Sequence, residues 1–261
     1  MLTMAKRLSR WEKRRLYRKI EEGKSRGGVS ASLFLEGEMN ALPEADCFFF
    51  CGTRLNPKGM LSVFFPNEKQ AEITVAEFVP GAGVMSVLFR AALRECHRVF
   101  VEDVYTVADP AFGFSIPNLC GVSFSYAWSE YMLRKDVAAL ADAAAAYAVS
   151  DVELRKEPDR VMAGTVRYCL LKQGQKTAEC RILPLDGGKG CYLFDLKTEE
   201  PFLRQGMAAG LITEIGKEYA GRGGTSMRLQ VSSENKPAFS LYRKLGFETS
   251  EERMYYKTEE N

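Results

Sequence analysis

The sequence is poor in the residues that build metal and redox sites. It has one histidine, His97, and two tryptophans among 261 residues. Its seven cysteines are odd in number and scattered, and no two of them form a CxxC pair. A zinc site or a disulfide framework needs cysteines or histidines at regular spacing. We therefore predict reduced thiols in an apolar core and no metal.

Long apolar runs are also missing. The longest, such as Cys47 to Cys51, are far too short to span a bilayer, and the basic N-terminus is not followed by an apolar segment. The formal net charge is only +2, so the field of the whole molecule is weak at a distance. We predict a cytoplasmic protein with no membrane partner, and we do not expect a nucleic-acid partner.

The N-terminus has the strongest charge bias of the chain. Residues 1–28 contain ten Lys or Arg against three Glu, and Leu8, Trp11, Leu16 and Ile20 are spaced for one face of a helix. We predict a basic helix whose apolar stripe docks on the protein. Binding of this helix to RNA or to an anionic membrane remains the alternative.

The rest of the chain contains two segments with the same order of strands and helices. Gly83 precedes Met132 by 49 residues and Gly206 precedes Met254 by 48, and EYMLRK near residue 130 resembles ERMYYK near residue 252. A repeat of about 122 residues indicates two copies of one α/β fold. We predict a basic helix at 1–28, a first lobe at 29–136, an Ala-rich helical linker at 137–149 and a second lobe at 150–261.

Each copy has the same predicted order of elements. In the first copy a hairpin covers residues 47–65, followed by a strand at 71–79, a helix at 84–96 and a strand at 97–107. In the second copy a hairpin covers residues 165–183, followed by a strand at 189–198, a helix at 206–220, a strand at 227–232, a helix at 237–245 and a strand at 253–257.

The stretch LRQGMAAG, residues 203–210, places small residues at the start of a predicted helix. Such a turn exposes backbone N–H groups at the positive end of the helix dipole, where phosphate binds. Arg204 could add a charge-assisted bond to a diphosphate. The predicted cradle consists of Leu203, Arg204, Gln205, Gly206, Met207, Ala208 and Ala209.

A second motif follows as NKPAFSLYRKLGF, residues 235–247. Together with the turn, it resembles the signature of the GNAT superfamily of acyl-CoA-dependent N-acetyltransferases, an R/Q-x-x-G-x-G/A loop and an N-x-x-A-x-x-L-Y-x-K-x-G-F segment. The positions in register are Asn235, Ala238, Leu241, Tyr242, Lys244, Gly246 and Phe247. The loop departs from the pattern because Leu203 stands where Arg or Gln is usual. The resemblance covers about residues 150–258.

The resemblance implies a fold and an activity. The fold would be α/β with two tandem GNAT-like lobes, each a mixed, mostly antiparallel twisted sheet flanked by helices. The activity would be transfer of an acetyl group from acetyl-CoA directly to a primary amine of a small molecule or peptide. By resemblance, the hydroxyl of Tyr242 would lie near the sulfur of CoA and would supply a proton or a hydrogen bond to the leaving thiolate, and Asn235 would bond the CoA arm. The backbone of Leu196 and Thr198 would hold the pantetheine arm, where two strands splay apart.

Amine attack on a thioester also needs a proton acceptor. Because His97 lies in the other half, the candidates are carboxylates or water. Asp195 is the best placed, followed by Glu199 and Glu200. A covalent route through Cys191 is not expected, because no neighbour in the sequence would lower the pKa of its thiol.

The first copy lacks most of this signature. VPGAGVMS keeps Gly83 but has Pro80 and Met85 at motif positions, and no N-x-x-A-x-x-L-Y segment follows. We predict a degenerate lobe that builds part of the acceptor cleft or a pseudo-symmetric interface. Two alternatives stay open: a non-catalytic acyl-CoA sensor, and a Rossmann-type nucleotide site using Gly81, Gly83 and Glu102. The chain could be a monomer with pseudo-dimeric lobes or a homodimer.

Overall fold

A computed structural model describes residues 2–25, 47–79, 83–108, 110 and 123–259. The chain divides into two compact units, which are Met1–Glu130 together with Glu252–Asn261, and Tyr131–Glu251. Two strands, β6 (Phe124–Asp136) and β12 (Glu248–Thr258), supply residues to both units. The predicted α/β fold with two lobes is therefore confirmed.

The first unit is a mixed sheet with helices on both faces. Its elements are β1 (Leu2–Ala5), α1 (Arg10–Ser25), β2 (Cys47–Gly52), β3 (Pro57–Asn67), β4 (Gln70–Glu77), α2 (Val84–Arg98) and β5 (Asp103–Ala108), with parts of β6 and β12. Its strand order is β1-β2-β3-β4-β5-β12-β6. Strands β1 to β4 are joined antiparallel, and β4 and β5 are parallel.

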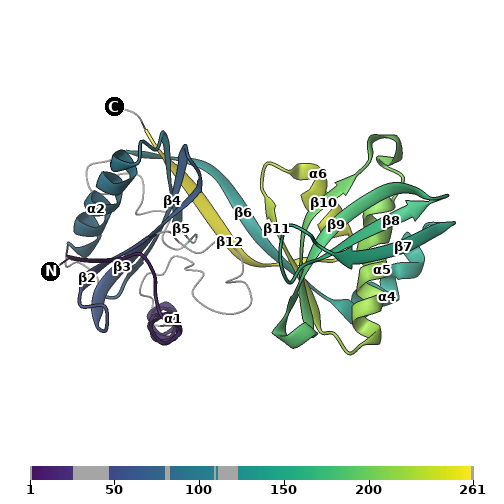
Figure 1. Cartoon of the computed structure of the whole chain (residues 1–261), viewed down its shortest axis with the longest axis horizontal. Coiled ribbons are helices and arrows are strands. Elements are labelled where there is room, and N and C mark those ends of the chain that lie inside the picture. The colour runs from purple at the N-terminus through teal and green to yellow at the C-terminus, as the bar shows by residue number, and fades with distance from the viewer. Residues whose placement is uncertain (1, 26–46, 80–82, 109, 111–122, 260–261) are drawn as a thin grey trace. The chain divides into compact units, whose positions relative to one another are not determined.

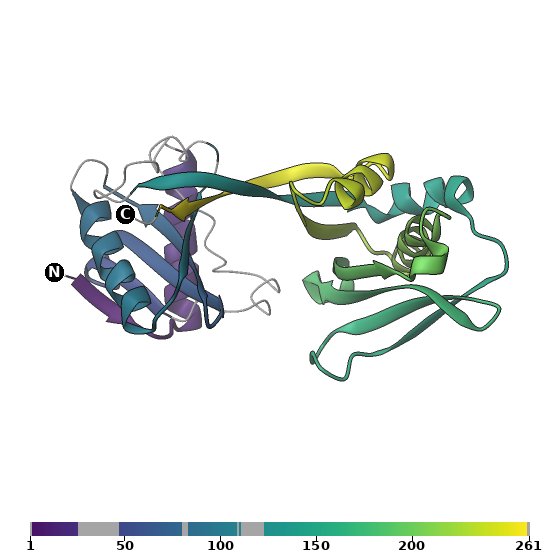
Figure 2. The same cartoon turned by 90° about the horizontal axis from the view of Figure 1, so that it is seen from above.

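The run CFFFC shows why helices cover both faces of this sheet. Successive side chains of a strand point to opposite faces. Cys47 and Phe49 pack in a cluster with α2, whereas Phe48 and Phe50 pack with α1. Figures 1 and 2 show α1 and α2 on opposite sides of β2, β3 and β4. A strand buried on both faces needs an uninterrupted apolar run, and this sequence supplies one.

Helix α1 docks on the sheet as the sequence predicted, with one correction. Leu8, Leu16 and Ile20 are buried against Phe50 and its neighbours. Trp11 was predicted on the same stripe, but it is 57% exposed. The prediction for Trp11 was wrong because Trp11 is five residues before Leu16 and nine before Ile20, spacings that at 3.6 residues per turn place it on the opposite side of the helix.

The second unit is also a mixed sheet. Its elements are α4 (Val137–Ala143), η3 (Ala144–Tyr147), β7 (Val152–Pro158), β8 (Val166–Lys172), β9 (Gln175–Leu185), η4 (Asp186–Gly188), β10 (Gly190–Thr198), η5 (Glu200–Phe202), α5 (Met207–Gly221), β11 (Ser226–Ser232) and α6 (Lys236–Lys244), with parts of β6 and β12. Its strand order is β6-β11-β10-β9-β8-β7, in which β10 and β11 are parallel.

Helix α5 organises the core of this unit. Leu211, Ile212 and Ile215 of α5 are fully buried among side chains of β8, β9, β10 and β11. Two glycines of α5 allow neighbouring segments to approach closely, because a Cβ at Gly216 would lie 2.7 Å from Leu140 and one at Gly210 would lie 2.8 Å from Val149. Small residues in this helix therefore serve packing as well as any ligand.

The Ala-rich segment belongs to the same core. Residues 137–149, predicted as a linker, contain α4 and η3, and Val137, Leu140 and Ala144 are buried. Asp136 caps α4, since its carboxylate accepts from the N–H groups of Ala138 and Ala139 at 2.8 and 3.2 Å. Helix propensity identified the helix, whereas its burial depends on the glycines of α5.

The end of the chain completes the first unit. Strand β12 pairs antiparallel with β5, and Met254 lies opposite Ala108 and Lys257 opposite Tyr105. Residues 252–261 are therefore grouped with the first unit, whereas the sequence placed them in a lobe at 150–261. Local patterns reveal a strand but not its distant partner.

The parallel pair β4 and β5 does not form part of a Rossmann sheet. In the described strands of the first unit, antiparallel pairs flank it on both sides, with β3 and with β12. A doubly wound nucleotide-binding fold needs several consecutive parallel strands. Gly81, which the alternative used, and Pro80 lie outside the described residues.

Candidate functional site

Strands β10 and β11 stay paired over only part of their lengths. Their parallel register ends at Leu193 opposite Leu229. β10 continues to Thr198 and β11 continues to Ser232, and within these described residues the register between them does not resume. The second unit therefore has the separation of strands that the family resemblance implied.

The free edge of β10 presents backbone groups to this gap. The N–H of Glu199 donates to the carbonyl of Thr177 on β9 at 2.9 Å. Along a strand, the N–H and C=O groups of successive residues point to alternate sides. The groups of Thr198 and Leu196 therefore point away from β9, toward the gap. An edge of this kind can pair with an extended ligand.

A bulge precedes these residues on β10. The register between β9 and β10 shifts between Phe194 and Lys197, and Asp195 adopts a left-handed φ of 51°. Bulges bend a strand and redirect its side chains. The bend lies where β10 leaves β11, so it accounts for the opening of the gap.

Helix α5 begins with unused backbone amides. Its cap is Gly206, in the left-handed region at φ 82°, and a Cβ there would meet no atom within 4 Å. The N–H of Gly210 donates to the carbonyl of Gly206 at 2.8 Å. The amides of Met207, Ala208 and Ala209 precede that bond, so the helix itself offers them no acceptor. Together with the helix dipole they favour an anion such as phosphate.

The side chains of the turn contribute less than its backbone. Leu203 is 53% exposed. Gln205 donates from its Nε2 to the carbonyl of Pro201 at 2.7 Å, so its amide holds the turn. Arg204, with a φ of 59°, exposes its side chain two residues before the helix cap. Of these three side chains, only Arg204 has a charge to offer to a phosphate.

Asn235 stands at the start of α6. Its Oδ1 accepts from the N–H of Ala238 at 3.2 Å, which makes it the cap of this helix. Capping uses one lone pair of the side-chain carbonyl and leaves the Nδ2 group able to donate. The structural role and the role implied by the resemblance are thus compatible.

Tyr242 projects from α6 into the core of the second unit. It is 5% exposed, and its ring packs edge-on against Phe247 at 5.8 Å between centroids. Burial raises the pKa of Tyr242 to about 12, with smaller contributions from Cys180 and Tyr192 on the central strands. The phenol is therefore protonated throughout the physiological range and is able to donate a hydrogen bond or a proton.

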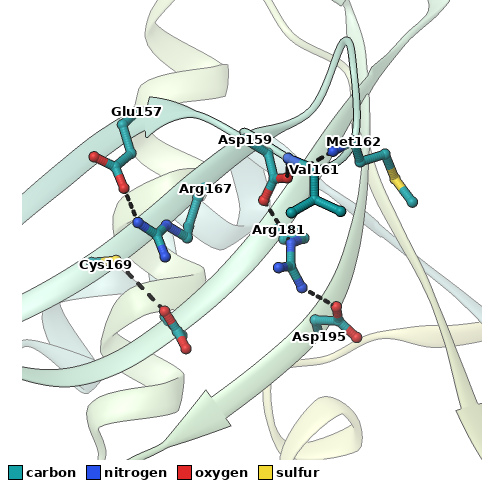
Figure 3. Close-up of polar contacts among 9 residues, drawn as sticks. Glu157, Asp159, Val161, Met162, Arg167, Cys169, Arg181 and Asp195 are labelled. Atoms are coloured by element: carbon teal, nitrogen blue, oxygen red, sulfur yellow. Dashed lines mark hydrogen bonds and ion pairs between the residues drawn. The ribbon is translucent and has the colours of Figure 1, made fainter.

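Asp195 is held by an arginine that sequence analysis missed. Arg181 on β9 donates from Nη1 to Asp195 and from Nε to Asp159 at 2.7 Å (Figure 3). Asp159 also accepts from the N–H groups of Val161 and Met162, both at 2.8 Å. The bond from Arg181 and these backbone bonds lower the pKa of Asp159 to about 2. Arg181 thereby ties the loop after β7 to the bulge of β10.

The other predicted acceptors of a proton are less well placed. Glu199 pairs with Lys176 at 3.0 Å, and Glu200 begins the short helix η5. Cys191 is fully buried, and burial raises the pKa of its thiol to about 12. A thiol with such a pKa is not a nucleophile at neutral pH.

A pocket of about 310 Å³ lies at the other end of α5. Its polar lining is internally paired, since Glu218 accepts from Lys156 at 2.8 Å and from the hydroxyl of Tyr168 at 3.0 Å. Along the helix it is about 20 Å from Gly206, given the 1.5 Å rise per residue. It is separate from the gap between β10 and β11.

The described residues show neither a metal-ligand cluster nor a membrane-spanning helix. They contain no group of three or more His, Cys, Asp or Glu side chains that could hold a metal ion. No helix within the same ranges is long and apolar enough to cross a membrane.

Known proteins resemble this chain in both sequence and fold. Residues 174–256 match the protein family described as 'FR47-like protein'. This range includes the gap, the turn and α6. A tandem GNAT protein from the clavulanic acid biosynthesis pathway matches with a TM-score of 0.71 at 14% identity, over 99% of this chain and 98% of that one. The chain has the tandem GNAT fold.

Further solved structures share this fold. A GCN5-related N-acetyltransferase from Sphaerobacter thermophilus matches with a TM-score of 0.67 at 10% identity, over 98% of this chain and 95% of that one. An acetyltransferase from the GNAT family of Colwellia psychrerythraea matches with a TM-score of 0.60 at 14% identity, over 99% and 100% of the two chains. No curated protein matches the sequence. At these identities the likeness concerns the fold, and activity must be argued from the site.

Proposed function

We propose that the second unit binds acetyl-CoA and transfers the acetyl group directly to a primary amine. The observation that carries this proposal is the gap between β10 and β11, which opens beyond Leu193 and Leu229. The gap adjoins the turn that precedes α5, and the buried Tyr242 belongs to the helix that follows β11. Core packing alone does not require two neighbouring parallel strands to lose their backbone pairing.

The proposed binding mode uses backbone groups for most of the coenzyme. The amides of Gly206, Met207, Ala208 and Ala209 hold the diphosphate, with help from Arg204. The pantetheine arm lies along β10 and bonds the backbone of Leu196 and Thr198, as an added strand would. Asn235 bonds the arm from the other side. Backbone recognition explains why Leu203 is tolerated where the family pattern has Arg or Gln.

The proposed chemistry needs one donor and one acceptor of protons. The free amine attacks the thioester carbonyl, its nitrogen forms the new bond to the acetyl carbon, and the bond from that carbon to sulfur breaks. Tyr242, whose raised pKa keeps the phenol protonated, donates a hydrogen bond or its proton to the departing thiolate, and any proton that it gives up is regained from water. Asp195 or a water bound near it takes the proton that the amine loses.

Ligand binding is tested first by thermal shift. CoA binds only the folded chain in this account, so it raises the melting temperature, whereas NAD and S-adenosylmethionine at the same concentration do not. An unchanged melting temperature with CoA contradicts the proposal. Free thiol release from acetyl-CoA in the presence of a panel of amines then tests turnover. A chain that binds CoA and releases no thiol with any amine is the acyl-CoA sensor instead.

A further inference from the structure

The positive charge of the chain is concentrated at the N-terminus. Residues 1–28 contain ten Lys or Arg and three Glu, out of 36 basic and 34 acidic residues in the whole sequence. The remaining 233 residues therefore hold 26 basic and 31 acidic side chains. The small net charge of the molecule conceals a segment of +7 beside a remainder of −5. Such an asymmetry is typical of a polyanion-binding segment.

Helix α1 presents this charge as a stripe. Trp11, Arg14, Arg15 and Arg18 are all exposed, and their spacing of three and four residues places them on one face. We call this set the basic stripe. Glu22, four residues further on, marks its end. Exposed Lys6 and Arg7 precede the helix and add to the same charge.

The arginines of the basic stripe are not used inside the protein. In the described part of the chain, no carboxylate forms an ion pair with Arg14, Arg15 or Arg18. The nearby acid Glu12 is occupied elsewhere, because it accepts from the N–H of Ser9 at 2.8 Å and pairs with Arg54 at 2.7 Å. A helix face that serves only to contact solvent typically carries charges of alternating sign, which stabilise the helix through ion pairs.

Trp11 gives the basic stripe an aromatic surface. It is 57% exposed, and the guanidinium of Arg15 lies 5.5 Å from the centre of its ring. An exposed tryptophan next to unpaired guanidinium groups matches the way proteins bind single-stranded nucleic acid. There, aromatic rings stack on unpaired bases and arginines bond phosphates.

The apolar face of α1 argues against a membrane as the partner. A helix that lies on a bilayer buries its apolar face among the acyl chains. In this chain that face is already in the core, since Leu8, Leu16 and Ile20 are all less than 10% exposed and pack on β2 and β3. The helix therefore has charge and one exposed ring to offer, but no apolar face to insert.

We propose that the basic stripe binds single-stranded RNA, with its arginines on phosphates and Trp11 stacked on a base. This site belongs to the first unit and does not depend on the activity proposed for the second.

The test uses the full chain and an oligouridylate of about 20 nucleotides, longer than small single-strand-binding domains cover. The double variant R14Q/R18Q loses two phosphate contacts. Its affinity falls, and the slope of log K against log salt decreases by about 1.4 because each phosphate contact contributes about 0.7 on a single strand. The matched control is R90Q/R94Q, which removes two exposed arginines at the same spacing from α2 of the same unit. The control keeps the affinity and slope of the wild type.

A second variant tests the aromatic contact. W11A weakens binding about fivefold to a hundredfold, the range of one stacked base, and leaves the salt slope unchanged. Circular dichroism shows that each variant keeps its fold. The proposal is overturned if the wild type does not bind the oligouridylate at low salt, or if R90Q/R94Q weakens binding as much as R14Q/R18Q. It is also overturned if vesicles rich in phosphatidylserine bind the chain and the oligouridylate does not.

Discussion

The two units contain the same central segment, and only one of them keeps the features of a coenzyme site. In the first unit it is β4, α2 and β5, and in the second it is β10, α5 and β11. In both, two parallel strands flank a helix that starts at a left-handed glycine, Gly83 with a φ of 63° or Gly206 with a φ of 82°. Neither glycine has an atom within 4 Å of where a Cβ would stand.

The differences lie next to the shared glycine. The second residue after the cap is Met85 in the first unit and Ala208 in the second. The end of β4 pairs with β3 in continuous register from Glu72 to Glu77, whereas β10 has its bulge at Asp195. In the sequence, the N-x-x-A-x-x-L-Y segment that supplies Asn235 and Tyr242 has no counterpart after residues 97–107.

The comparison shows which parts of the segment are needed for packing alone. A strand, a helix and a parallel strand persist in the first unit because they bury apolar side chains against β3 and α2. The left-handed cap persists because the chain must turn sharply there. The end of β4 (Glu72–Glu77) has no bulge, the first turn of α2 carries Met85 in place of a small residue, and the sequence of that unit has no segment that matches residues 235–247. The core of that unit therefore does not require these features. Their presence in the second unit is evidence for a ligand.

The largest expected effect comes from placing a side chain on each of the two glycines. Gly206→Val and Gly83→Val impose similar strain, about 1 to 3 kcal/mol each, because both replace a left-handed glycine. Only Gly206→Val should impair CoA binding, by about 3 to 6 kcal/mol, since it denies the diphosphate two charge-assisted hydrogen bonds. Calorimetric titration with CoA measures the binding free energy of each variant. Equal losses in the two variants would mean that the two caps do not differ in function.

The next effect concerns the tyrosine that only the second unit has. Tyr242→Phe keeps the packing against Phe247 and removes the hydroxyl, so kcat should fall about a hundredfold while the dissociation constant for CoA stays the same. Steady-state rates and titration separate the two quantities. A variant with wild-type kcat would exclude Tyr242 as the proton donor.

A third expected effect distinguishes the units by pH. Burial, together with the charge of Glu130, raises the pKa of Glu72 in the first unit from 4.5 to about 7. The folded state then binds this proton more tightly than the unfolded state does. This contribution to stability is therefore full below pH 4.5 and is lost as the pH rises through 7, by about 3 kcal/mol. In the second unit the sign is opposite, since the pKa of Asp159 is lowered to about 2 and its contribution is lost as the pH falls from 3.8 through 2.

Both tryptophans, Trp11 and Trp128, belong to the first unit, so their fluorescence reports its unfolding. Urea titrations at pH 5 and pH 8 should differ by this amount in the wild type and agree for Glu72→Gln. A variant that keeps the full difference would assign the pH dependence to another group.

The smallest expected effect is that of Asp195→Asn, which removes the carboxylate from the bulge while keeping its shape. Turnover should fall about fivefold to tenfold, and the acidic limb of the pH profile of kcat/KM should shift. Arg181 already occupies one carboxylate oxygen, so a large loss is not expected. An unchanged acidic limb would assign the base to water.

Local patterns predicted most of the elements of both units. The hairpins β2–β3 and β8–β9 and the helices α2, α5 and α6 follow from alternation, helical period and turn residues. Strand β7 was missed because VELRKEP has little apolar character, and β1 was missed because it has only four residues. The pairing of β12 with β5 joins residues about 150 apart, and no local signal specifies it.

For the candidate site, the motif of residues 235–247 pointed to Asn235 and Tyr242, and the small residues after Gly206 pointed to the turn; their roles stay predictions. The sequence did not point to Arg181 or Asp159, because their contact depends on how β9 and the loop after β7 meet at the bulge of β10. In α1, the helical period already separates Trp11 from Leu16 and Ile20, so its exposure could have been predicted from the sequence.

The most direct test of the central claim is a crystal structure of the chain with CoA. We expect the diphosphate oxygens to lie about 2.7 to 3.2 Å from the backbone nitrogens at Gly206 to Ala209. We also expect the pantetheine arm to run along Leu196 and Thr198. A diphosphate bound at Gly83, or at the pocket near Glu218, would contradict this claim.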